Sequence, residues 1–143
     1  MAAGPQYGKQ YIRFAETALV ADNLAIPQFS LVQVTGTTEP PSITNVFAGA
    51  GEALGVLQQE FNTTASGLGT DLLRLGTVAT SGLLLVAMDA ANAVAIGDVL
   101  AVDAVGQASA AGGAFAVTIN GTTPIVRQLV TIGGTSFALV SFN

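Results

Sequence analysis

Short hydrophobic runs separated by turn-forming residues characterise the chain from Ser30 onward. Leu31–Val34 stops at Thr35-Gly36, and Leu83–Met88 stops at Asp89. Runs of this length, bounded by Gly, Pro, Asn and Asp, are typical of strands and are too short for core helices. The pattern predicts an all-β protein, a compact antiparallel β-barrel or sandwich-like domain with at most one short helix.

The last third of the chain carries the clearest hairpin signal. Ile125–Ile132 and Ser136–Phe142 flank Gly133-Gly134, a dipeptide that suits the two-residue turns of antiparallel hairpins. Such a turn sets Ile132 opposite Thr135, and the facing pairs that follow are Thr131 with Ser136, Val130 with Phe137, Leu129 with Ala138, Gln128 with Leu139 and Arg127 with Val140. Asn120-Gly121 predicts a second such hairpin, between Phe115–Ile119 and Ile125–Ile132.

Two further segments have local signals. Ser42–Leu54 is rich in Gly and Ala and is interpreted as a loop with a short helix. Asp89 precedes an alanine-rich stretch and is expected to cap a single helical turn through Ala95. Leu72–Thr80 and Leu83–Met88 are expected to form two separate strands.

The first segment, residues 1–29, differs from the remainder. It holds both tyrosines and two of the four Lys and Arg residues, and Gly and Pro interrupt its start. We expect an extended N-terminal arm, followed by a β-rich domain over residues 30–143. Aromatic and Arg side chains anchor protein interfaces, so the candidate partner-binding residues are Tyr7, Tyr11, Ile12, Arg13 and Phe14. The alternative is an arm that folds back over the domain's own core.

Composition excludes most catalytic chemistry. The chain has neither His nor Cys, which removes Ser-His and Cys-His pairs, thiol nucleophiles and the usual zinc ligands. Asp98 and Asp103 flank one expected strand at an odd separation, so their carboxylates point to opposite faces. Asp89, Asp98 and Asp103 match no calcium loop, and turn formation explains them better than a metal site does. We therefore expect no enzyme activity, metal or cofactor.

Other classes of partner are disfavoured as well. Gly49–Gly55 has the spacing GxGxxxG and follows no parallel strand, so it does not indicate a dinucleotide site. Only four Lys and Arg stand against nine Asp and Glu, which leaves no basic face for nucleic acid. The uncharged stretch Leu75–Met88 is too short and too polar to cross a membrane. A small-molecule substrate is not indicated either.

The sparse charge favours permanent assembly. Charged residues make up 9% of the chain, so docking desolvates few charges. An antiparallel domain also leaves strand edges that must be paired or blunted, and Lys is nearly absent. We expect these edges to pair with another chain.

One passage resembles a known family. Ala95–Ala108 reads AIGDVLAVDAVGQA, which is similar to the "G-D-hydrophobic strand-D-x-x-G" passage of the small head decoration, or cement, proteins of tailed bacteriophages. The resemblance covers about residues 50–143, and the long Gly-rich Ser42–Leu54 segment departs from it. It implies a β-barrel-like homotrimer on the outer surface of an expanded icosahedral head, made in the host cytoplasm and bound to the major capsid protein. Tyr7 to Phe14 would then face the capsid.

These observations leave two functional hypotheses besides an enzyme that uses Asp or Glu alone. The first is a structural capsid decoration protein of the virion that stabilises contacts between major capsid subunits. The second is a trimeric phage fibre or receptor-binding module, for which sparse charge and turn-rich β structure are also typical.

Overall fold

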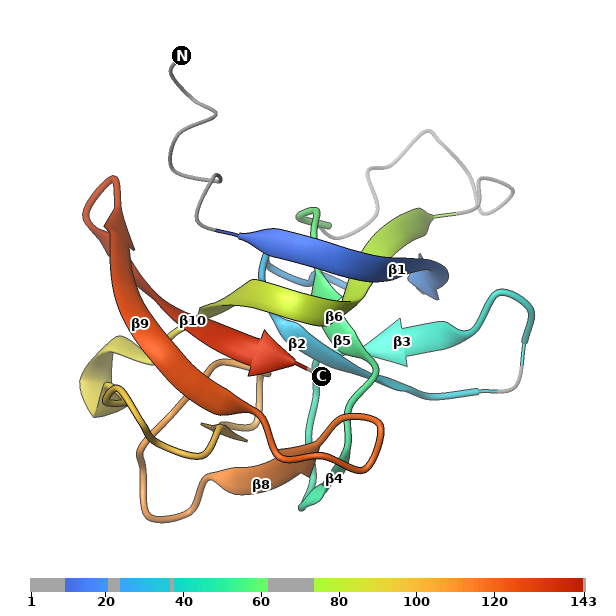
Figure 1. Cartoon of the computed structure of the whole chain (residues 1–143). Helices are drawn as coiled ribbons and strands as arrows, with labels where there is room; N and C mark the ends of the chain where they lie inside the picture. The colour runs from blue at the N-terminus through green and yellow to red at the C-terminus, as the bar shows by residue number, and fades with distance from the viewer. Residues whose placement is uncertain (1–9, 21–23, 37, 62–73, 143) are drawn as a thin grey trace.

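The computed structural model describes residues 10–20, 24–36, 38–61 and 74–142. Within these residues the chain forms ten strands and one 3₁₀ turn, η1 (Figure 1). The elements in chain order are β1 (Tyr11–Val20), β2 (Leu31–Val34), β3 (Ser42–Thr44), β4 (Gly51–Glu52), β5 (Gly55–Leu57), β6 (Leu75–Ala87), η1 (Ala90–Asn92), β7 (Ala101–Val102), β8 (Phe115–Thr118), β9 (Ile125–Ile132) and β10 (Thr135–Phe142).

Most strands belong to one large sheet that closes on itself. Its order is β1-β3-β2-β5-β6-β10-β9, and β1 also pairs with β6, so β1, β3, β2, β5 and β6 form a ring. A small sheet, β4-β8-β7, lies beside it. All strand pairings are antiparallel except the short ones between β1 and β3 and between β4 and β8. The predicted all-β, barrel- or sandwich-like class is confirmed.

Strand β6 links the ring to the C-terminal hairpin. Its first half pairs with β1 and β5, and its second half pairs with β10. Gly82 lies between the halves with a φ of 128°, which side-chain-bearing residues rarely adopt. The sequence predicted two separate strands here, which is wrong, because Gly82 lets a single strand bend and change partners without ending.

Two hydrophobic cores follow from this arrangement. The ring encloses a core of residues from all of its strands and from the segment after β1: Ala18, Val20, Ile26, Val32, Ile43, Leu57 and Val78. A larger core lies between the second half of β6, the β9–β10 hairpin and the small sheet, and includes Phe47, Leu84, Leu85, Leu100, Val117, Ile119, Val140 and Phe142. Burial of each large apolar side chain contributes about 1.5–3 kcal/mol to folding.

The C-terminal hairpin forms in the predicted register as far as Gln128. Ile132 pairs with Thr135 across Gly133-Gly134, both of which have positive φ, and Leu129 pairs with Ala138. A register shift after Leu139 then places Val126, not Arg127, opposite Val140. The prediction for Arg127 is wrong because this β-bulge adds one residue to β9.

The second predicted hairpin does not form. Asn120-Gly121 does make a tight turn, in which Ile119 and Thr122 exchange two backbone hydrogen bonds of 2.9 Å. Strand β8, however, pairs with β4 and β7 and not with β9. Val117 and Ile119 are buried in the larger core, and this burial selects the partners of β8.

The two local predictions had different outcomes. Ser42–Leu54 contains strands β3 and β4 and no helix, because short segments of it complete both sheets. Asp89 does cap the turn η1, since its side chain accepts a hydrogen bond from Ala91 N–H. This turn ends at Asn92, earlier than the Ala95 that the sequence predicted.

Within the first segment, strand β1 is extended and pairs with β6 from Tyr11 to Leu19. The C-terminal end of the segment is buried, since Ala18, Val20 and Ile26 belong to the core of the ring. Residues 1–9 lie outside the described residues.

Candidate partner-binding surface

The residues in the N-terminal two thirds of β1 are exposed to solvent, although the strand pairs with β6. Every residue from Tyr11 to Thr17 is exposed, with Tyr11 63%, Ile12 41% and Phe14 65% accessible. Strand β3 covers β1 only at Leu19 and Val20, so the earlier residues extend beyond the ring. Large apolar side chains at this density on one exposed strand are typical of a binding surface.

The backbone of β1 leaves one edge open. The N–H of Val20 donates to the carbonyl of Arg74, whereas the N–H of Leu19 donates to the carbonyl of Pro41 on the opposite side. Because successive N–H groups alternate, those of Ala15 and Thr17 point to the side of β3, where no described residue pairs with them. Register shifts on either side of Phe14 distort the strand before Ala15. In its aromatic part, β1 can therefore contact a partner through side chains, but it lacks a regular edge for backbone pairing.

Strand β9 provides a second open edge. Its outer side contacts the segment before β7, where Val126 N–H donates to the Asp98 carbonyl. Among the described residues, no strand pairs with the outer side of β9 from Arg127 to Ile132. Leu129 of β9 is 42% exposed and lines, with Thr131, an apolar hollow of about 440 Å³.

A polar groove runs beside β1. Two adjoining hollows of about 440 and 320 Å³ share Glu16, Thr80 and Asn120. The larger one reaches Arg13 and Phe14, and the smaller one reaches Glu52 of β4 and Val34 of β2. The groove is therefore built from β1, β6, β4, the end of β2 and the Asn120 turn.

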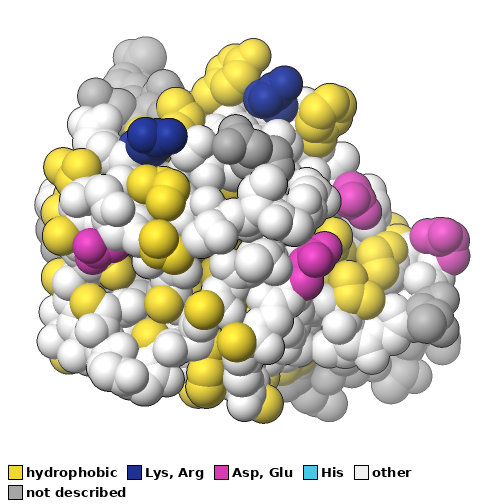
Figure 2. Space-filling model, turned by 60° about the horizontal axis from the view of Figure 1, so that its bottom comes forward, with side chains coloured by type: hydrophobic (Ala, Val, Ile, Leu, Met, Phe, Trp, Pro, Cys, Tyr) yellow, Lys and Arg dark blue, Asp and Glu magenta, His cyan; other side chains and the backbone are white. Residues whose placement is uncertain are grey.

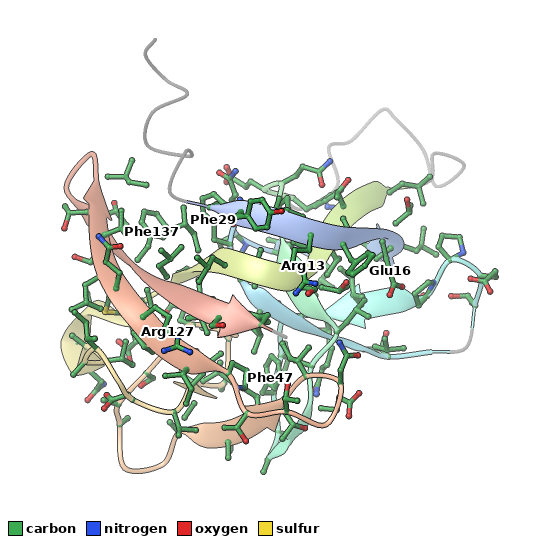
Figure 3. All side chains as sticks on the ribbon, in the orientation of Figure 1. Arg13, Glu16, Phe29, Phe47, Arg127 and Phe137 are labelled. Carbon is green, nitrogen blue, oxygen red and sulfur yellow. The ribbon has the colours of Figure 1, made fainter. Side chains whose placement is uncertain are left out.

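The charged side chains described in this groove do not form ion pairs with one another. Arg13 and Glu16 extend from β1 on the side of β6 (Figure 3). In the part of the chain that the structure describes, neither forms an ion pair, and no hydrogen-bond partner is present for the side chains of Glu52 and Asn120. Figure 2 shows that charged side chains are sparse on the face in view, where hydrophobic side chains lie among neutral ones.

Of the residues predicted from the sequence, Tyr11, Ile12, Arg13 and Phe14 lie together on the exposed part of β1. Tyr7 lies outside the described residues. The sequence missed the groove residues Glu52, Thr80 and Asn120, which reach β1 only through long-range pairings. The Asn120-Gly121 dipeptide predicted the turn, but nothing local placed that turn beside β1.

The other acidic candidates lie in turns. Asp98 accepts a hydrogen bond from Ala95 N–H at 2.8 Å, and Asp103 accepts one each from the N–H groups of Val105 and Gln107. Asp89 accepts hydrogen bonds from the N–H of Ala91 and from the side chains of Asn92 and Ser109. These contacts, that of Asn92 foremost, lower the pKa of Asp89. Turn formation, which the sequence favoured, accounts for all of these carboxylates.

Two other kinds of site are absent from the described residues. No cluster of three or more His, Cys, Asp or Glu side chains is positioned to hold a metal ion in that part of the chain. None of the helical elements described has the length and hydrophobicity of a membrane span.

Comparisons with known proteins identify no relative: no family model, no curated protein and no solved structure matches this chain.

Proposed function

We propose that this protein is a structural, non-enzymatic decoration protein of a phage virion. In this proposal it binds the outer surface of an expanded icosahedral head as a homotrimer and stabilises contacts between major capsid subunits. The proposal rests on the family resemblance of Ala95–Ala108 and on the surface of the β1 strand.

The observation that carries the proposal is the exposure of the aromatic residues on β1. Tyr11 and Phe14 are each more than 60% accessible in a strand that is otherwise held firmly by β6. Aromatic side chains with little rotamer freedom contribute most of the affinity in many protein interfaces. Arg13, between them, adds a cation without an ion-pair partner among the described residues. Such a surface fits a shell of protein subunits as its partner.

The two open edges support a ring of copies. A trimer with rotational symmetry uses two different surfaces on each copy, whereas a symmetric dimer uses one surface twice. Strands β1 and β9 provide two different edges, and β9 runs antiparallel to β1 because β6 and β10 lie between them with antiparallel pairings. Antiparallel addition of β9 from one copy to the Ala15 to Thr17 stretch of β1 in the next would pair the open N–H groups there.

The sparse charge is consistent with a protein that acts by contact area. With a net charge of −5 and few charges to desolvate, each copy loses little free energy when it docks. Individual sites can be weak, since many copies on one shell act together through their effective concentration.

The test is to mix the purified protein with expanded and unexpanded phage heads that lack accessory proteins. We expect cosedimentation with the expanded heads and a gain in their resistance to heat or to chelator. Binding to neither form, or binding without any gain in resistance, contradicts the proposal.

A matched pair of variants locates the contact. Replacing Tyr11 and Phe14 together with Ala removes exposed rings only, so the fold persists, and we expect cosedimentation to fall at least about tenfold. Ile96 is 64% exposed on another part of the surface, and Ile96→Ala serves as the control. Equal losses in both variants would show that β1 is not the contact surface.

A trimeric fibre or receptor-binding module is the second candidate. The polar groove beside Phe14 favours it, since a receptor-binding protein needs a recess with unpartnered polar groups. The head-binding assay separates the two, because a fibre module would bind its receptor and not assembled heads.

A further inference from the structure

The groove beside β1 has the size of a small-ligand site. Its two hollows have volumes of about 440 and 320 Å³, which lie within the range of small-ligand sites. Because they share Glu16, Thr80 and Asn120, they adjoin as one recess with two parts. The shape fits a short linear molecule.

The polar groups of the groove are free to bind a ligand. Glu16 and Glu52 each carry two acceptor oxygens, and Asn120 carries both a donor and an acceptor. None of these side chains hydrogen-bonds to another described residue. The Thr80 hydroxyl donates to the carbonyl of Phe14 at a long distance of 3.4 Å and keeps its acceptor capacity.

An exposed aromatic residue lines the same recess. Phe14 is 65% accessible and lines the larger hollow together with Glu16 and Asn120. Its ring offers an apolar face to a ligand that also reaches these hydrogen-bonding groups. A pyranose matches the apolar ring and the polar groups, because one face of the sugar presents C–H groups and its edge presents hydroxyls that donate and accept hydrogen bonds.

The charge of the groove and its position disfavour several classes of ligand. The groove contains Glu16 and Glu52 against Arg13 alone, so its net charge is negative. Sialylated, sulfated or phosphorylated sugars would meet repulsion there. A divalent cation lacks a third acidic ligand among the described residues. An extended polypeptide would seek the open backbone edge of β1, whereas the recess lies over Thr80 and Ser81 of β6.

We propose that this groove binds a neutral oligosaccharide. Phe14 packs against one sugar ring, and Glu16, Glu52 and Asn120 hydrogen-bond to hydroxyl groups along the chain. The proposal does not depend on head binding, since each copy of the chain contains all of the groove residues.

The test is a titration of the full-length protein, followed by NMR, with linear tetrasaccharides of glucose, galactose and N-acetylglucosamine and with a sialylated tetrasaccharide. We expect saturable binding of at least one neutral probe near the millimolar range, with shifts concentrated at Glu16, Glu52, Thr80 and Asn120. Failure of every neutral probe to bind at about 10 mM, or tighter binding of the sialylated probe, overturns the proposal.

Variants with matched controls complete the experiment. Glu16→Gln keeps the shape and removes the charge, and Phe14→Ala removes the ring; each should weaken binding at least about fivefold. Glu60→Gln and Ile96→Ala change similar exposed groups elsewhere and should leave affinity unchanged. Unchanged affinity in Glu16→Gln and Phe14→Ala overturns the proposal, as does a library peptide that binds this groove when no neutral sugar does.

Discussion

Gly82 of β6 lies directly against the backbone of Tyr11 in β1. A β-carbon on residue 82 would overlap the carbonyl oxygen of Tyr11, and the φ of 128° is unfavourable for any side-chain-bearing residue. This close approach fixes the start of β1 on the sheet and thereby positions Phe14 and Arg13. The candidate surface therefore depends on a residue that contributes no side chain to it.

We expect Gly82→Ala to lower the free energy of unfolding by at least about 2 kcal/mol, because it adds both backbone strain and a clash with β1. Chemical denaturation measures this change. Gly112→Ala is the control, since nothing lies within 4 Å of its β-carbon position and its φ is ordinary. Similar stabilities of the two variants would show that β1 does not need this contact.

The outer edge of β9 can be blocked without damage to the hairpin. Ile132 and Thr135 close a two-residue turn and form the hydrogen-bonded pair, so the next residue, Thr131, points its N–H away from β10. We expect Thr131→Pro to abolish a trimer built on β9 while the free energy of unfolding changes by less than about 1 kcal/mol. Native mass spectrometry reads the oligomer.

Thr131→Val is the matched control, because it keeps the N–H and changes only the exposed side chain. A trimer that survives Thr131→Pro would show that copies associate through another surface. A monomeric wild-type protein would contradict the assembly itself.

The β9–β10 turn also allows a stabilising change. Gly133 has a φ of 58° and Gly134 one of 85°, the conformation in which Asn-Gly is preferred. We expect Gly133→Asn to raise the free energy of unfolding by about 0.4–1 kcal/mol, because it restricts the unfolded chain more than Gly does. Thermal melting measures the gain. Gly133→Val should be destabilising, and stabilisation by Val would contradict the assignment of the turn.

These turns show which parts of the fold the sequence predicts. Gly133-Gly134 determines the hairpin register locally, and Asp89 determines the η1 turn through hydrogen bonds within three residues. Asn120-Gly121 has an equally strong local signal, but the strands on either side of it pair elsewhere. Burial of long-range neighbours, which no local pattern encodes, decides strand pairing in this chain.

The candidate site also combines residues that the sequence indicates locally with residues that only long-range pairing brings together. Tyr11 to Phe14 are recognisable as interface residue types, so the sequence indicates them as candidates. The closure of the ring brings Glu52, Thr80 and Asn120 beside Phe14 through pairings such as that of Glu16 with Val78. Those pairings join residues about 60 positions apart in the chain, and neither periodicity nor turn residues predict them.

Asp89 joins two segments through its carboxylate. Its Oδ2 accepts hydrogen bonds from Ser109 Oγ at 3.1 Å and from Asn92 Nδ2 at 3.0 Å, and its Oδ1 accepts one from Ala91 N–H. All of these contacts favour the charged form, so the pKa of Asp89 in the folded protein lies below its ordinary value.

A lowered pKa in the folded state stabilises the protein above the pKa of the unfolded chain, and the contribution is lost as pH falls through the folded value. We therefore expect the wild type to melt at a higher temperature than Asp89→Asn at pH 7, with the difference shrinking below about pH 4. Thermal melting of both proteins from pH 7 to pH 2 measures it, and the comparison cancels the titration of the other carboxylates. A difference that stays constant or grows toward pH 2 would show that the charge of Asp89 does not hold the Ser109 segment against η1.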